Sequence, residues 1–212
     1  MHELQSKLVN ISADDVNLEG SLNIPERSKS IVLFAHGSGS SRFSPRNNYV
    51  ASVLQKSGLA TLLIDLLTEQ EDQVYETRFD IDLLTKRLII ATKWLRNNPP
   101  SKDLSIGYFG ASTGAAAALQ AAAKLGAEIK AIVSRGGRPD LAKENLKKVQ
   151  APTLLLVGGN DTEVIKLNQI ALDELKTTCD LVIVPGATHL FEEPGTLEKV
   201  AQISAKWFKK YL

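Results

Sequence analysis

The chain has 212 residues, 43% of them hydrophobic, which is enough for one α/β domain with a substantial core. Its 25 basic and 24 acidic residues leave a net charge of +1, which argues against a nucleic-acid-binding surface. The single cysteine, Cys179, excludes an internal disulfide and fits a reducing compartment. We therefore expect a cytoplasmic protein with no nucleic-acid partner, and composition leaves its oligomeric state open.

No segment has the composition of a membrane anchor. Residues 1–13 lack the basic start and apolar centre of a signal peptide. Residues 104–123 carry no charge, but they include several hydroxyl side chains and three glycines. A spanning helix needs more strongly apolar side chains than these. We predict a soluble protein without membrane insertion.

Strand and helix patterns alternate along the chain. The predicted strands cover residues 4–11, 16–24, 30–35, 60–65, 106–110, 129–134, 153–157 and 181–184. The predicted helices cover residues 45–56, 79–97, 115–126, 141–149, 163–175 and 194–211. Residues 66–77 are acidic and are expected to form a loop.

This order predicts a single α/β domain over residues 1–212, with a mainly parallel central sheet and helices on both faces. The first two strands should form a hairpin that turns at Asp14 and Asp15. Residues 135–140 are too few to hold a cap domain between the strand and helix that flank them. Ligands of such sheets bind beyond the carboxyl ends of the strands, where the small polar loops fall.

The sequence from Gly110 to Gly114 is a G-x-S-x-G motif with Ser112 at its centre. Such a motif places a serine on a sharp strand-to-helix turn, with its hydroxyl exposed above the sheet. The motif alone is common, so a glycine-rich turn with an incidental serine is an equally good interpretation. The choice depends on what else lies at the same edge of the sheet.

A serine nucleophile needs a base and a carboxylate that orients the base. His2 lies at the N-terminus, His36 follows an early strand, and His189 follows the last strand. Asp161 follows the strand before that one, and its only close rival is Glu163. Alternatively, His189 is a surface histidine and Asp161 caps the helix beginning at residue 163. Together, the chain order Ser112, Asp161, His189 favours a catalytic triad.

These residues resemble a known superfamily. His36–Gly37, the 110–114 motif, the 158–161 loop and the late His189 are similar to α/β-hydrolases, and closest to compact dienelactone-hydrolase-like enzymes. The resemblance covers almost the whole chain and implies the α/β-hydrolase fold without a cap domain. Dienelactone hydrolases proper use a cysteine nucleophile, whereas the matching position here is Ser112 and Cys179 is distant. The resemblance therefore implies a serine esterase chemistry.

The resemblance also implies an oxyanion hole made by the backbone N–H groups of Ser38 and Thr113. His36 would then hold the loop that carries Ser38, and it would not act as a base. We thus expect a serine hydrolase that cleaves a small carboxylic ester, thioester or lactone through an acyl-enzyme on Ser112. The alternative is a non-catalytic protein of this fold that binds a small ligand.

No metal or organic cofactor is expected, because the histidines and Cys179 have no metal-ligand spacing. The expected partner is a small acyl substrate, and a site without a lid suits short acyl groups. Arg42, Arg135 and Arg138 fall in loops at the same sheet edge and could hold a substrate carboxylate. The slightly favoured alternative is that they form salt bridges with neighbours such as Asp65, Asp140 or Glu193.

Overall fold

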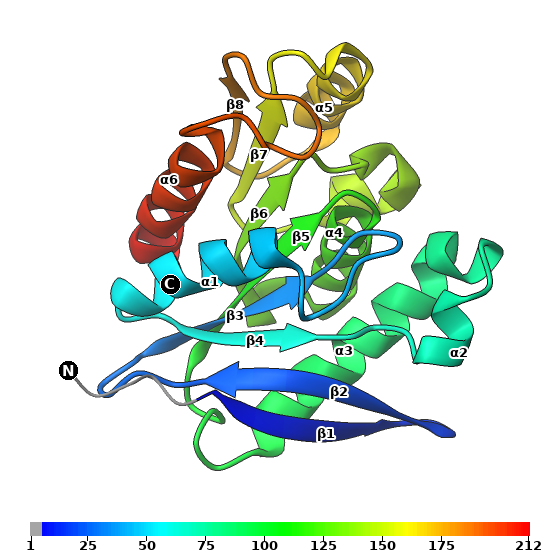
Figure 1. Cartoon of the computed structure of the whole chain (residues 1–212), viewed down its shortest axis with the longest axis vertical. Helices are drawn as coiled ribbons and strands as arrows, with labels where there is room; N and C mark the ends of the chain where they lie inside the picture. The colour runs from blue at the N-terminus through cyan, green and yellow to red at the C-terminus, as the bar shows by residue number, and fades with distance from the viewer. Residues whose placement is uncertain (1–5) are drawn as a thin grey trace.

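The computed structural model describes residues 6–212 (Figure 1). Its strands are β1 (Lys7–Ala13), β2 (Val16–Asn23), β3 (Ser30–Ala35), β4 (Ala60–Ile64), β5 (Ser105–Ala111), β6 (Ile129–Arg135), β7 (Thr153–Gly158) and β8 (Cys179–Val184). Its α-helices are α1 (Pro45–Lys56), α2 (Glu69–Asp72), α3 (Ile81–Asn97), α4 (Thr113–Leu125), α5 (Thr162–Glu174) and α6 (Thr196–Tyr211). Three 3₁₀ segments are η1 (Glu76–Phe79), η2 (Gly126–Glu128) and η3 (Pro139–Lys148).

All strands belong to one eight-stranded sheet in the order β1-β2-β4-β3-β5-β6-β7-β8. β1 and β2 form the expected antiparallel hairpin, and β2 also runs antiparallel to β4. Every other neighbouring pair is parallel, which confirms the mainly parallel sheet. Consequently β3, β5, β7 and β8 all end at one edge, and the loops that follow them meet there.

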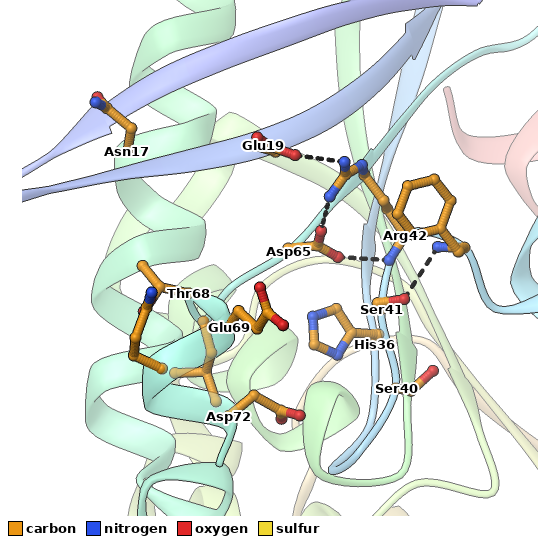
Figure 2. Close-up of a pocket in the computed structure, with 13 residues that line it drawn as sticks. Asn17, Glu19, His36, Ser40, Ser41, Arg42, Asp65, Thr68, Glu69 and Asp72 are labelled. Atoms are coloured by element: carbon orange, nitrogen blue, oxygen red, sulfur yellow. Dashed lines mark hydrogen bonds and ion pairs between the residues drawn. The ribbon is translucent and has the colours of Figure 1, made fainter. Parts of the chain in front are cut away.

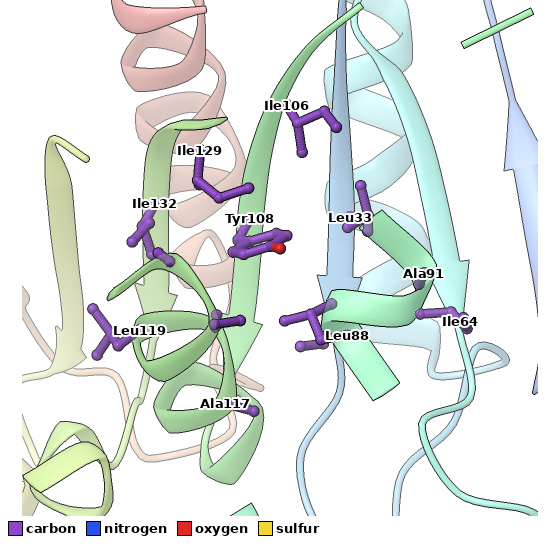
Figure 3. Packing of buried hydrophobic residues seen from close by; sticks show 14 of the residues in the cluster. Leu33, Ile64, Leu88, Ala91, Ile106, Tyr108, Ala117, Leu119, Ile129 and Ile132 are labelled. Carbon is purple, nitrogen blue, oxygen red and sulfur yellow. The ribbon is translucent and has the colours of Figure 1, made fainter. Parts of the chain in front are cut away.

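Helices cover both faces of the sheet (Figure 1). On one face, α3 and α4 pack over Leu33, Ile106 and Tyr108, as Figure 3 shows. On the other face, α1 and α6 pack over a second cluster that includes Phe34 and Phe109. The alanine-rich α4 is buried along most of its length, because small side chains let a helix approach a sheet closely.

The region expected to be a loop contains two short helical elements, α2 and η1. The reason is a capping box: Thr68 Oγ1 accepts from the Glu71 N–H, and the Glu71 carboxylate accepts from the Thr68 N–H. Glu71 also forms a two-pronged ion pair with Arg87 of α3. This tertiary pair stabilises a turn that is too short to be recognised from hydrophobic periodicity.

Other boundaries differ by a few residues. The predicted helix at 141–149 is the 3₁₀ segment η3, interrupted at Lys143, whose φ is 52°. β8 begins at Cys179, two positions earlier than predicted. The expected start of the first strand at residue 4, and His2, lie outside the described residues.

β6 ends at Arg135 and η3 begins at Pro139, so no cap domain is inserted there, as the sequence predicted. Over residues 6–212, no helix is long and apolar enough to cross a membrane.

Candidate active site

Ser112 lies at the junction of β5 and α4, in a backbone conformation that is unusual for serine. Its φ is 49° and its ψ is −120°. A non-glycine residue at positive φ is strained, and such strain occurs at the nucleophile turn of a G-x-S-x-G motif. Both glycines of the motif are needed, because a Cβ at Gly110 would collide with Ala115 and one at Gly114 with the carbonyl of Ala35.

The loops after β7 and β8 are joined by backbone hydrogen bonds. The N–H of Gly159 donates to Val184 O at 2.8 Å, and the N–H of Asn160 donates to Ala187 O at 2.9 Å. This contact brings Asp161 and His189 together, with 2.6 Å between Asp161 Oδ2 and His189 Nδ1. The structure therefore joins the two residues that the sequence predicted as acid and base.

The carboxylate of Asp161 is directed to the histidine and not to its own helix. Asp161 is the N-cap residue of α5, but its side chain makes no capping hydrogen bond. Glu163, its rival in the sequence, is the second residue of α5 and pairs with Lys166 on the exposed surface. The Asp161 side chain therefore does not cap the helix, contrary to the alternative interpretation of the sequence.

Ser112 and His189 approach each other across the end of β6. The Ser112 N–H donates to Arg135 O at 3.2 Å. At the next residue, a Cβ added to Gly136 would lie 3.4 Å from His189 Cε1. Within residues 6–212, no hydrogen bond joins Ser112 Oγ to His189. Such bonds are often long in an unliganded site and tighten when substrate binds.

The loop after β3 lies against the serine. A Cβ on Gly37 would be 3.0 Å from Ser112 Cβ, so only glycine lets this loop come so close. Both ring nitrogens of His36 are occupied by backbone groups. Nε2 accepts from the Leu66 N–H at 3.2 Å, so Nδ1 carries the proton and donates to Gly37 O at 3.0 Å. His36 thus holds the loop and has no free nitrogen for a base.

The two predicted oxyanion-hole donors differ in their present partners. The N–H of Ser38 donates to Thr113 Oγ1 at 3.0 Å, so a side chain of the adjacent residue occupies it. Thr113 is the first residue of α4, where backbone N–H groups have no helical acceptor. The two residues therefore lie side by side next to Ser112.

Two of the three candidate arginines are paired with carboxylates. Arg42 forms ion pairs with Asp65 and Glu19. Arg138 binds Asp140 through two bonds of 2.9 and 2.8 Å, and this pairing raises the pKa of Arg138. Both pairings match the structural alternative that the sequence left open.

Arg135, at the end of β6, has a different environment. Its side chain lies on the face of the sheet covered by α1 and α6, and it is 7% exposed. Over residues 6–212, its Nε and Nη1 are buried without a hydrogen-bond partner. Burial, followed by the charge of Arg46, lowers the pKa of Arg135 to about 10, so it remains cationic at neutral pH. A buried unpaired cation is costly and therefore rare.

A cavity lies beside this constellation and not over it. It has a volume of about 670 Å³ and is bounded by the ends of β2 and β4, the loop after β3, and α2. Figure 2 shows His36, Ser40 and Ser41 on one wall and Glu69 and Asp72 on the other. A smaller hollow shares His36, Leu67 and Asp72 with it and reaches Ser38. The two hollows thus extend from Ser38 toward β2.

The lining of this cavity is negatively charged. Four carboxylates face it, from Glu19, Asp65, Glu69 and Asp72, against the single guanidinium of Arg42. We call it the acidic cavity. Sequence reasoning missed Glu19, Glu69 and Asp72. The acidic run after β4 lies at a carboxyl end of the sheet and could have indicated two of them, but Glu19 comes from a strand of opposite direction.

Cys179 is a poor alternative nucleophile. It begins β8 and is paired in register with Thr153, at the edge of the sheet opposite Ser112. Burial raises the pKa of its thiol to about 12, which leaves little thiolate at neutral pH. Within residues 6–212, no three His, Cys, Asp or Glu side chains are grouped to hold a metal ion.

Comparisons with known proteins cover nearly the whole chain. A model described as the dienelactone hydrolase family matches residues 18–211. A curated Mycobacterium tuberculosis protein named "Putative phosphoribosyl transferase" is 54% identical over 209 residues. That match includes 99% of this chain but only 47% of the relative, so the chain spans about half the length of the curated relatives it matches.

Solved structures give the same fold. A dienelactone hydrolase from Anabaena variabilis is 57% identical, with a TM-score of 0.97 and full coverage of both chains. Est1E from Butyrivibrio proteoclasticus is 17% identical, with a TM-score of 0.82 and coverage of 96% of this chain and 98% of that one. A Pyrococcus furiosus esterase is 21% identical, with a TM-score of 0.81 and coverage of 98% and 92%. This chain has the α/β-hydrolase fold and belongs to the dienelactone hydrolase family.

Proposed function

We propose that the protein is a serine hydrolase that cleaves a small carboxylic ester, thioester or lactone. The observation that carries the proposal is the 2.6 Å bond between Asp161 and His189, beside a serine in a strained turn. Membership of a hydrolase family supports the reaction class. We infer that the phosphoribosyl transfer named for the mycobacterial relatives belongs to the half of those proteins that this chain does not match.

In this mechanism, Ser112 Oγ attacks the carbonyl carbon while His189 Nε2 takes its proton. Asp161 accepts from the Nδ1–H of His189, which fixes the tautomer and leaves Nε2 free to act as the base. The carbonyl oxygen becomes an oxyanion beside the N–H groups of Ser38 and Thr113. The imidazolium then protonates the leaving alcohol or thiol. Water, activated by the same histidine, releases the acyl group from Ser112.

A fluorophosphonate probe tests the proposal, because it reacts with activated serines and mimics the first step. We expect mass spectrometry to find one adduct, on Ser112, and none on the Ser112→Ala variant. The probe should also block hydrolysis of p-nitrophenyl acetate. An unlabelled Ser112 in folded protein would favour the alternative, a protein of this fold that only binds a small ligand.

We also propose Arg135 as the residue that would hold an acidic group on the substrate. Arg42 and Arg138 have their guanidinium groups bound by carboxylates, whereas Nε and Nη1 of Arg135 have no partner within residues 6–212. The Arg135 carbonyl accepts from the Ser112 N–H, so the backbone of Arg135 lies next to that of the nucleophile. A guanidinium with free donors binds carboxylates well.

Matched neutral and anionic esters separate this role from a structural one. We expect Arg135→Gln to raise KM for the anionic ester about tenfold, the cost of one charged hydrogen bond, and to leave the neutral ester nearly unchanged. Arg138→Gln is the matched control and should affect both esters alike. If Arg135→Gln does not fold, Arg135→Lys replaces it in the comparison, because lysine keeps the positive charge but cannot form the two-pronged hydrogen bonds of a guanidinium. An equal effect of the Arg135 variant on both esters would refute the binding role.

A further inference from the structure

The residue after the nucleophile offers more than a backbone N–H. Thr113 is 2% exposed, and its Oγ1 accepts the Ser38 N–H at 3.0 Å. In the proposed mechanism, the N–H groups of both residues face the oxyanion. The hydroxyl of Thr113 therefore lies next to the position where negative charge develops.

A threonine hydroxyl has one proton to donate and lone pairs that accept. The bond from Ser38 uses a lone pair. In the part of the chain that the structure describes, the Thr113 hydroxyl donates to no acceptor, and Ser112 Oγ makes no hydrogen bond. The buried hydroxyl of Thr113 thus accepts one hydrogen bond, from Ser38, and has a proton that is free to donate beside Ser112.

We propose that the Thr113 hydroxyl is a third donor of the oxyanion hole, an inference that rests on the proposed function. The Ser38 N–H is then shared between Thr113 Oγ1 and the oxyanion in a three-centre hydrogen bond, and Oγ1 donates its own proton to the oxyanion. The proton stays on Oγ1 throughout, while the proton of Ser112 goes to His189. Because Ser38 polarises the hydroxyl through Oγ1, the hydroxyl is a stronger donor than it would be alone.

The shape of threonine fits this role. Its branched Cβ restricts χ1 in a helix, and the bond from Ser38 selects the orientation of Oγ1. The donor is therefore oriented before substrate binds, which is the condition under which such groups accelerate a reaction. Valine has the same shape without the hydroxyl, and serine has the hydroxyl without the branch.

A merely structural role makes a different prediction. If Oγ1 only holds the Ser38 loop, its loss should weaken substrate binding and transition-state binding together. If Oγ1 only blocks the Ser38 N–H before substrate arrives, its loss should free that donor and raise kcat. A third donor predicts a lower kcat with KM little changed.

The experiment compares wild type with Thr113→Val and Thr113→Ser. We would measure kcat and KM for p-nitrophenyl acetate, and the affinity of an aliphatic trifluoromethyl ketone, which forms an oxyanion on Ser112. We expect valine to lower kcat by about 100-fold, the usual effect of one oxyanion-hole donor, and to lower the ketone affinity in parallel. The Thr113→Ser variant should retain most of the wild-type kcat and most of the affinity for the ketone.

A Thr113→Val variant with unchanged or higher kcat would overturn the inference. So would a variant that binds the substrate and the ketone more weakly by the same factor. So would a serine variant as impaired as valine. If valine does not fold, Thr113→Ala takes its place in the same comparison. Fluorophosphonate labelling of Ser112 is measured in every variant. An unlabelled Ser112 in wild type would refute the proposed function, whereas labelled wild type with an unimpaired valine variant would refute only the role of Thr113.

Discussion

Two regions at the same edge of the sheet are held together in different ways. The first, which we call the serine edge, comprises Ser112, Asp161, His189 and the loops that carry them. Backbone contacts hold it: loop-to-loop hydrogen bonds, and glycines without room for a Cβ. The second is the acidic cavity, which is lined by charged side chains on the ends of β2 and β4 and on the short helix α2.

The difference indicates how each region responds to change. Atoms set by packed backbone cannot shift without cost, which suits a reaction that needs oriented groups. Exposed charged side chains, such as those of Glu19 and Glu69, can be exchanged with little effect on the fold, whereas Arg42 and Asp65 are largely buried in their ion pair. We therefore expect chemistry to depend on the serine edge and substrate preference to depend partly on the acidic cavity.

Removing the hydroxyl of Ser112 should separate the regions most strongly. We expect Ser112→Ala to lower kcat for p-nitrophenyl acetate by about four to six orders of magnitude, as for triads generally, while the protein remains folded. Ser40→Ala is the matched control on the wall of the acidic cavity and should keep nearly full turnover. Near wild-type turnover by purified Ser112→Ala would contradict the proposed mechanism.

The orienting carboxylate should come next. Asp161→Asn keeps the shape but favours the wrong tautomer of His189, and we expect kcat to fall by about 10⁴-fold. Glu163→Gln, two residues further along, removes a surface ion pair with Lys166 and should leave kcat nearly unchanged. Steady-state kinetics on both variants decides the assignment, and a larger loss in the glutamate variant would reverse it.

The ion pair between Glu71 of α2 and Arg87 of α3 should affect stability and not turnover. Arg87 bonds hold the pKa of Glu71 at about 2, below its ordinary value of 4.5. Since the folded pKa is depressed, the stabilisation is complete above about pH 4.5 and declines as pH falls toward 2. Glu71→Gln leaves buried Arg87 without its charged partner, and we expect it to cost on the order of 2 kcal/mol at pH 7.

Urea unfolding of wild type and Glu71→Gln at pH 7 and pH 3 measures this difference. The gap between the two proteins should narrow at the lower pH, because the wild-type carboxylate is then stabilised less. A gap that stays constant with pH would show that the pair contributes through shape and not through charge.

The smallest effect should follow from a single charge on the cavity wall. Glu69 lines the acidic cavity and carries a charge that disfavours anionic ligands there. We expect Glu69→Gln to lower KM for an anionic ester by about two- to threefold at low salt, and less at high salt, with the neutral ester unaffected. An unchanged ratio between the two esters would mean that the cavity does not influence the site.

Much of the fold follows from local pattern. Continuous apolar runs gave β3, β4 and β7 to within a residue, because strands covered on both faces are apolar throughout. The helix α2 was missed because one helical turn has no periodicity of its own, and its pair with Arg87 is distant in sequence. The interrupted segment η3 was predicted as a regular helix, because local apolar spacing does not report a residue such as Lys143 at positive φ.

The residues that can form the candidate site could be named from the order of the amino acids. Chain order and strand ends brought Ser112, Asp161 and His189 to one edge, since parallel strands must end together. Which of their neighbours have free side chains depends on the folded arrangement. It paired Arg42 and Arg138 with carboxylates, left Arg135 buried without a partner among the described residues, and set Thr113 against Ser38. Pairing depends on distances of a few ångströms between loops far apart in sequence, and no local pattern encodes them.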